Sequence, residues 1–122
     1  MQNSELFRRS IILPLDERAE ESLRANDVDM TTAVKHLPIP SDAFFEDLWK
    51  AGLFQEINRR CDTLIDDYEV EFIEAASIPK LAAVMEALVQ QTSKPELKAF
   101  LMDLRKRTTA ALTLKRPVLF VL

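Results

Sequence analysis

The fold is decided by residues 77–91, SIPKLAAVMEALVQQ, a stretch that carries only two charged residues, Lys80 and Glu86. Ser77 is a suitable N-cap and Pro79 is tolerated in a first helical turn, so the stretch is predicted to be a helix. Alanine, valine, leucine and methionine occupy eight of its other thirteen positions. A helix that is apolar almost all round is buried by its neighbours, and we therefore place it in the middle of the fold.

The next helix is predicted from a capping-box pattern, in which Ser93 and Glu96 flank Pro95. Apolar and small side chains then recur every three or four positions on one face, namely Leu97, Phe100, Leu101, Leu104, Thr108, Ala111 and Leu112. The polar face carries bases with Met102 among them. This pattern predicts a long amphipathic helix that packs against residues 77–91.

Two further helices are predicted upstream. Ser41 can cap a helix over residues 42–51, and Gly52 stands where helices often end in a left-handed residue. After Gly52, apolar residues again recur at steps of three and four, as Leu53, Ile57, Cys61, Leu64, Ile65, Tyr68 and Phe72. We interpret this run as a helix that extends into the following acidic segment, with a boundary near Thr63 left open.

Both ends of the chain resemble strands. Residues 7–13 are rich in large apolar and β-branched side chains before Pro14, and the apolar residues 118–122 follow Pro117. An unpaired apolar strand invites aggregation, so we expect the two to pair. Residues 16–25 suit a short exposed helix, and the alternation over 28–34 suggests a third strand.

The predicted fold is therefore mainly α in a single domain over residues 1–122, with about four helices. A small two- or three-stranded sheet is formed by the N-terminal and C-terminal strands.

The composition excludes most catalytic sites. The chain has one histidine, one glycine and one cysteine, which leaves no material for a His-rich or Cys-rich metal site or for a glycine-rich nucleotide-binding loop. A Cys61–His36 pair is not favoured, because Cys61 falls on an apolar stripe. Carboxylate pairs alone could still perform acid–base chemistry, but no pattern places two of them in a cleft. We interpret the chain as a non-catalytic protein without a cofactor.

The segment 62–74 stands out because it contains six carboxylates and no base. One interpretation is a solvated helix face balanced inside the molecule by Arg105, Lys106 and Arg107. A second is a divalent-cation site at Asp62 and Asp66 with Asp67 or Glu69, which the absence of any calcium-loop spacing disfavours. The third, which we prefer, is a binding face for a basic protein. Its predicted residues are Asp62, Asp66, Asp67, Tyr68, Glu69, Glu71 and Glu74.

Two stretches, GLFQEIN at residues 52–58 and IDDYEVE at residues 65–71, resemble small bacterial immunity proteins that neutralise polymorphic or contact-dependent toxins. The resemblance implies tight one-to-one binding to a toxin or nuclease, often through an acidic surface, and no cofactor. It adds support for Asp66, Asp67, Tyr68, Glu69 and Glu71.

The alternative is a structural or regulatory subunit that forms oligomers through its C-terminal helix and strand. Met102 on a polar helix face and residues 118–122 as a strand open to edge pairing motivate it. Nucleic-acid binding is not favoured, because no aromatic stacking platform accompanies the bases of the C-terminal third. No signal peptide or membrane span is recognised, and a single cysteine fits a reducing compartment, so we expect a cytoplasmic protein.

Overall fold

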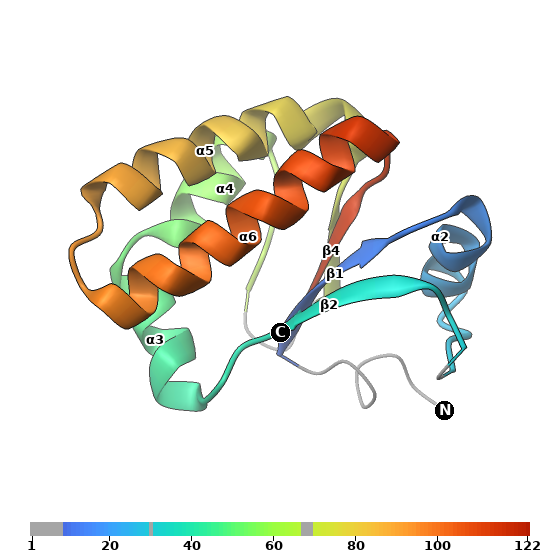
Figure 1. Ribbon diagram of the computed structural model, residues 1–122, viewed down its shortest axis with the longest axis horizontal. Coiled ribbons are helices and arrows are strands. Elements are labelled where there is room, and N and C mark those ends of the chain that lie inside the picture. The colour runs from blue at the N-terminus through green and yellow to red at the C-terminus, as the bar shows by residue number, and fades with distance from the viewer. Residues whose placement is uncertain (1–8, 30, 67–69) are drawn as a thin grey trace.

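The computed structural model describes residues 9–29, 31–66 and 70–122. In this part of the chain, five α-helices and one short 3₁₀ helix accompany four strands (Figure 1). In chain order they are β1 (Ser10–Pro14), α2 (Glu17–Arg24), β2 (Val34–Pro38), α3 (Asp42–Lys50), α4 (Leu53–Cys61), β3 (Val70–Ile73), η1 (Ala75–Ser77), α5 (Ile78–Gln91), α6 (Pro95–Leu114) and β4 (Val118–Val121). The predicted fold of about four helices with a two- or three-stranded sheet is thus wrong, because β2 and β3 widen the sheet to four strands.

The sheet has the strand order β2-β1-β4-β3, and each neighbouring pair is antiparallel. Ser10 lies opposite Val121 and Ile12 opposite Leu119, so the expected pairing of the two terminal strands is confirmed. β4 has β1 on one side and β3 on the other. The C-terminal strand is therefore internal to the sheet and is not open to edge pairing, which corrects that part of the oligomer interpretation.

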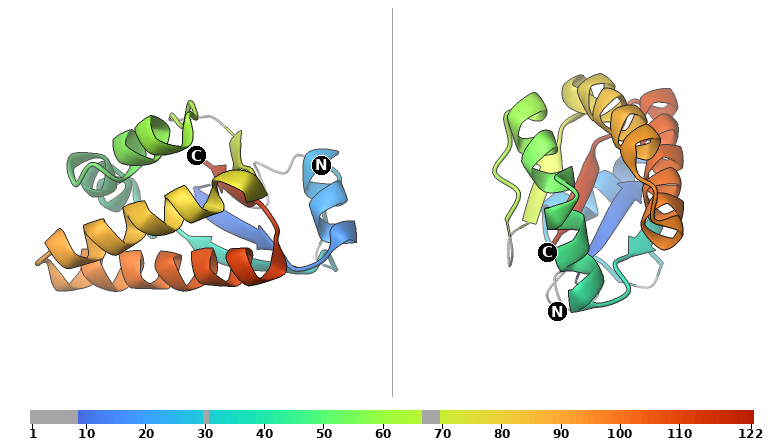
Figure 2. Two further views of the ribbon diagram at one scale, coloured as in Figure 1. Left: turned by 90° about the horizontal axis from the view of Figure 1, so that it is seen from above. Right: turned by 90° about the vertical axis from the view of Figure 1, so that its left-hand side faces the viewer.

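Alternation along the strands gives the sheet two apolar faces. Ile11 of β1 and Phe120 of β4 belong to the large core cluster, which α3, α4, α5 and α6 complete. Ile12 and Leu119 belong to a smaller cluster on the other face, where α2 contributes Leu23. Figure 2 shows the helical layer on one side of the sheet and α2 on the other. The sheet is consequently covered on both faces, but unequally.

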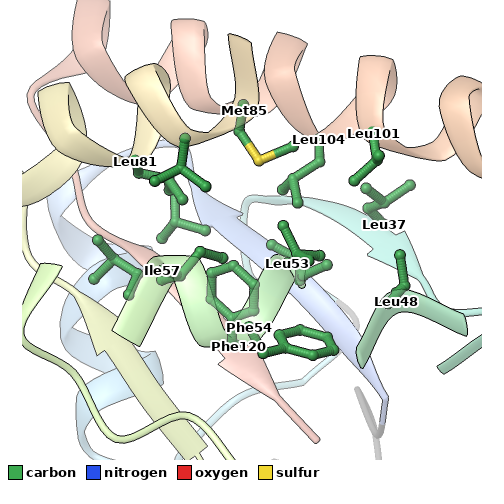
Figure 3. Packing of buried hydrophobic residues seen from close by; sticks show 14 of the residues in the cluster. Leu37, Leu48, Leu53, Phe54, Ile57, Leu81, Met85, Leu101, Leu104 and Phe120 are labelled. Carbon is green, nitrogen blue, oxygen red and sulfur yellow. The ribbon is translucent and has the colours of Figure 1, made fainter. Parts of the chain in front are cut away.

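The large core is built around aromatic and branched side chains from every layer (Figure 3). Phe54 of α4 and Phe120 of β4 are fully buried, and their ring centroids lie 6.4 Å apart. α5 lies between α4 and α6 and contributes six buried side chains, as its nearly uncharged sequence predicts. Ala83 and Ala87 of α5 are nevertheless exposed, so this helix is not enclosed on all sides.

The helix starts agree only partly with the capping patterns in the sequence. Asp16 caps α2 by accepting a hydrogen bond from the Ala19 N–H at 2.7 Å, and Ser41 caps α3 by accepting one from the Phe44 N–H at 3.1 Å. The capping box expected at Ser93 is wrong, because α6 begins after Lys94 with Pro95 in its first turn and no side-chain cap. A proline in the first turn removes one of the N–H groups that a cap would satisfy.

The strand expected over residues 28–34 lies further along the chain. Asp29 instead forms a turn, in which its carboxylate accepts hydrogen bonds from both the N–H and the hydroxyl of Thr31. Asp and Thr side chains that bond the nearby backbone compete with strand formation. The strand begins at Val34 and pairs Leu37 with Ile11.

Candidate binding surface at the edge of the sheet

In the described part of the acidic segment, residues 62–66 form a loop and Val70–Ile73 form an edge strand, so the helix that we predicted there is wrong. α4 ends at Cys61, and Asp62 adopts the left-handed conformation (φ 56°, ψ 48°) while its N–H donates to the Asn58 carbonyl. Continuing the helix would have placed like charges such as Asp62 and Asp66 one turn apart, which is unfavourable. Asp is also among the few residues that tolerate left-handed geometry.

The side chain of Asn58 fixes the loop that follows α4. Its Oδ1 accepts hydrogen bonds from the Ile65 N–H at 2.7 Å and from the Thr63 hydroxyl at 2.9 Å, and its Nδ2 donates to the Ile65 carbonyl at 2.9 Å. Ile65 is buried at 2% exposure, whereas Leu64 beside it is 81% exposed. The loop therefore presents a leucine to solvent between two exposed carboxylates, Asp62 and Asp66.

β3 forms one edge of the sheet beside this loop (Figure 2, right). Glu71 pairs with Phe120 and so faces the side of the helical layer, where it is half-buried. Val70 pairs with Val121, faces the opposite side and is 47% exposed. Successive side chains of a strand alternate between faces, so the predicted acidic residues cannot all share one surface.

Glu74 forms an intramolecular ion pair with Arg24. Its carboxylate accepts two hydrogen bonds from Arg24 of α2, at 2.6 and 3.1 Å. The Arg24 guanidinium also lies over the ring of Phe72, 4.4 Å from its centroid, and hydrogen-bonds Glu20. The bonds to Glu74 raise the pKa of Arg24 above its ordinary value. Glu74 therefore attaches α2 to the end of β3.

The ion pairs of the structure differ from the sequence-based alternative in which bases of the C-terminal helix balance the acidic segment. Arg105 pairs with Glu86 of α5 at 3.3 Å, and Arg107 donates to the carbonyl of Asp103. Within the described residues, none of the three bases Arg105, Lys106 and Arg107 forms an ion pair with the 62–74 segment. Arg24, the base that pairs with Glu74, lies fifty positions upstream and gave no signal in the sequence.

The structure thus separates the seven predicted binding residues into three groups. Asp62, Asp66 and Glu71 lie at the edge of the sheet on the loop and on β3, together with Leu64; we call these four residues the acidic edge. Glu74 is paired with Arg24 of α2. Asp67, Tyr68 and Glu69 lie outside the described residues.

The candidates for other chemistry are far from forming a site. Cys61 is buried in the core, and burial raises the pKa of its thiol, which disfavours the reactive thiolate. His36 lies on β2, the opposite edge strand, and burial together with Arg107 lowers its pKa. Within the described ranges, no three His, Cys, Asp or Glu residues are arranged to hold a metal ion.

Comparisons with models of protein families, with functionally characterised proteins and with solved structures gave no match to this chain. None of the helices described is long and apolar enough to cross a membrane. The chemistry of the acidic edge is therefore the main basis for a functional proposal.

Leu64 and Asn58 are the two residues of this surface that the sequence did not reveal. Leu64 fits the three-and-four spacing of a buried helical face, and only the end of α4 at Cys61 turns it outward. Asn58 has no recognisable spacing to Ile65, because its bonds depend on the left-handed turn between them. A polar residue inside a helix that bonds a loop is visible only in the folded chain.

Replacing Asn58 with alanine is expected to lower the free energy of unfolding by about 2–3 kcal/mol, because the half-buried N–H and carbonyl of Ile65 lose their partner. Urea titration followed by Trp49 fluorescence measures the change. Gln55→Ala is the matched control, because it removes an exposed hydrogen bond from the Gln55 side-chain amide to the Trp49 carbonyl. This loss should lower the free energy of unfolding by under about 0.5 kcal/mol. Equal losses in the two variants would contradict the role assigned to Asn58.

Proposed function

We propose that this chain is a non-catalytic binding protein that neutralises a basic protein, such as a toxin or nuclease, through the acidic edge. The observation that carries the proposal is Leu64, which is 81% exposed between Asp62 and Asp66 on a loop held by Asn58. Protein interfaces combine an apolar centre with a polar rim, and Leu64 with its two flanking carboxylates provides both. The carboxylates would steer a basic partner and the leucine would enter a pocket on it.

The resemblance to bacterial immunity proteins supports the same proposal, since those proteins bind toxins one to one. In this interpretation the acidic edge covers the cationic, phosphate-binding surface of the partner. Catalysis is not required of any residue, and no cofactor is needed. A protein that acts inside the producing cell would be cytoplasmic, as the composition also suggests.

Charge reversal at Asp62 and Asp66, both to lysine, is the direct test. The partner to use is the product of the gene immediately upstream, because immunity genes adjoin their toxins. The double variant is expected to bind about 100-fold more weakly, with most of the change in the association rate, and to lose protection of growth. Binding by the unaltered protein should weaken as salt is raised.

The matched control is the double variant Glu17→Lys and Glu21→Lys, which makes the same change in net charge at two exposed positions of α2. It should bind and protect normally. Normal binding by the Asp62→Lys, Asp66→Lys variant, with the fold intact by circular dichroism, would exclude the acidic edge as the binding surface. If the control variant binds the partner as weakly as the Asp62→Lys, Asp66→Lys variant, the loss of affinity is due to net charge and not to the acidic edge.

One observation still supports the alternative function as a subunit that forms oligomers. α6 exposes Met102, Leu112 and Leu114 at 38–41% of their surface. The strand β4 no longer contributes, because it is internal. Sedimentation of the purified chain separates the two functions, since a neutralising protein is a monomer that forms a one-to-one complex only with its partner.

A further inference from the structure

A second surface of opposite charge lies between α4 and α5. Two hollows of about 390 and 320 Å³ adjoin there, because both are lined by Ala51, Leu88 and Gln91. The first also contacts Glu56, Arg59 and Arg60 of α4 and Val84 and Ala87 of α5. The second continues past the α5–α6 connection to Asp47, Lys50, Lys94 and Leu97. We call this continuous depression the α4–α5 groove.

The floor of the groove is apolar. Val84, Leu88 and Leu97 are almost fully buried and show only their outer atoms to the groove, while the small side chain of exposed Ala87 keeps the floor low. No aromatic residue lines either hollow. Such a floor accepts the side chains of leucine or valine better than a nucleobase, which requires a stacking partner.

The walls of the groove are mainly basic, although the whole chain has a net charge of −4. Four bases and two acids line the two hollows: Arg59, Arg60, Lys50 and Lys94, against Glu56 and Asp47. Glu56 is already paired with Arg59 at 2.6 Å. In the described part of the structure, Arg60, Lys50 and Lys94 form no ion pair, so three cations remain available along the groove.

We propose that the α4–α5 groove binds an acidic, amphipathic segment of a partner protein. Apolar side chains of the segment lie on Val84, Ala87 and Leu88, and its carboxylates pair with Arg60, Lys50 and Lys94. Amphipathic helices bind grooves between helices in this manner, with anchors spaced three and four residues apart. The inference does not depend on the acidic edge, which is proposed to bind a basic protein.

The probe is a 15-residue peptide with leucine at helical spacing and glutamate elsewhere, titrated into the ¹⁵N-labelled full chain. Chemical-shift changes are expected at residues 50–60 and 84–94. A peptide with serine in place of every leucine is expected to bind at least tenfold more weakly. Equal binding of that serine peptide, or of an oligothymidylate, at these residues would overturn the proposal in favour of a general anion site.

Ala87→Glu tests the groove itself, because it fills the floor and adds an acid there. Ala83→Glu is the control, because it makes the same change at another exposed position of α5 that does not line the groove. Glutamate has a high helix propensity, so both replacements are compatible with the helix. The peptide is expected to bind the Ala87→Glu variant at least tenfold more weakly than the Ala83→Glu variant. Equal affinity for the two variants would overturn the proposal.

Discussion

Removing residues 118–122 is expected to prevent the chain from folding. Val118, Leu119, Phe120 and Val121 are 0% exposed and Leu122 is 5% exposed, and β4 joins β1 to β3. Burial of a large apolar side chain contributes about 1.5–3 kcal/mol, so losing five of them removes about 10 kcal/mol. That exceeds or equals the whole stability of many domains, about 5–15 kcal/mol.

Circular dichroism and urea titration measure the effect of this truncation. The shortened chain should lack a cooperative transition, whereas the double variant Leu112→Ala, Leu114→Ala should retain it, because both leucines are about 40% exposed on α6. A truncated chain that still unfolds cooperatively would contradict the central position of β4. It would also restore this strand as a candidate for association between copies.

Replacing Phe54 with alanine is expected to lower the free energy of unfolding by about 3–5 kcal/mol. The ring of Phe54 is fully buried, and its centroid lies 4.9 Å from that of Trp49 and 5.5 Å from that of Phe45. It also meets Phe120 across the interface between the helical layer and the sheet. Truncation leaves a cavity that such a rigid aromatic cluster cannot close.

Phe44→Ala is the matched control, because Phe44 is half-buried and its ring contacts only Phe100 among the aromatic pairs of the described chain, at 5.2 Å. Its loss should be no more than about half as large, in keeping with its partial burial. Urea titration followed by far-ultraviolet circular dichroism compares the two, since the fluorescence of Trp49 will itself change beside Phe54. Equal losses would mean that Phe54 is not the centre of this core.

Most helices were predictable from local pattern. α3 and α6 have apolar residues at helical spacing, and α5 is a nearly uncharged run of helix-forming residues, so their positions match the sequence within a few residues. The strands at the two ends were also predictable, because runs of branched and aromatic residues beside prolines favour extended structure. What local pattern could not give was the number of strands between them.

β2 and β3 are edge strands, and edge strands carry a weak signal. β2 exposes Lys35 and His36, and β3 is only four residues long with two of them half-buried. Their pairing is decided by contacts with β1 and β4, which are distant in sequence. The apolar spacing through Leu64 and Phe72 imitated a helix, although Leu64 is exposed and Phe72 lies on a strand.

The candidate site was predictable as a region but not as a surface. The density of carboxylates in 62–74 was evident, and Asp62, Asp66 and Glu71 do lie at the edge of the sheet. Their separation from Glu74 could not be foreseen, because the bonds from Arg24 require α2 to pack on the outer face of the sheet. The exposure of Leu64 likewise depends on the left-handed turn at Asp62 and on the Asn58 bonds that hold the loop after it.

The strand order has a consequence for how fast this protein folds. β1 and β4, the two central strands, come from opposite ends of the described chain, with all the helices between them. Contacts between residues so distant in sequence require a large loop to close, which slows folding relative to purely helical proteins. The hairpin of α5 and α6 contains only local contacts and can form early. The sheet must then assemble around it, and the pairing of β1 with β4 is the step that we expect to limit the rate.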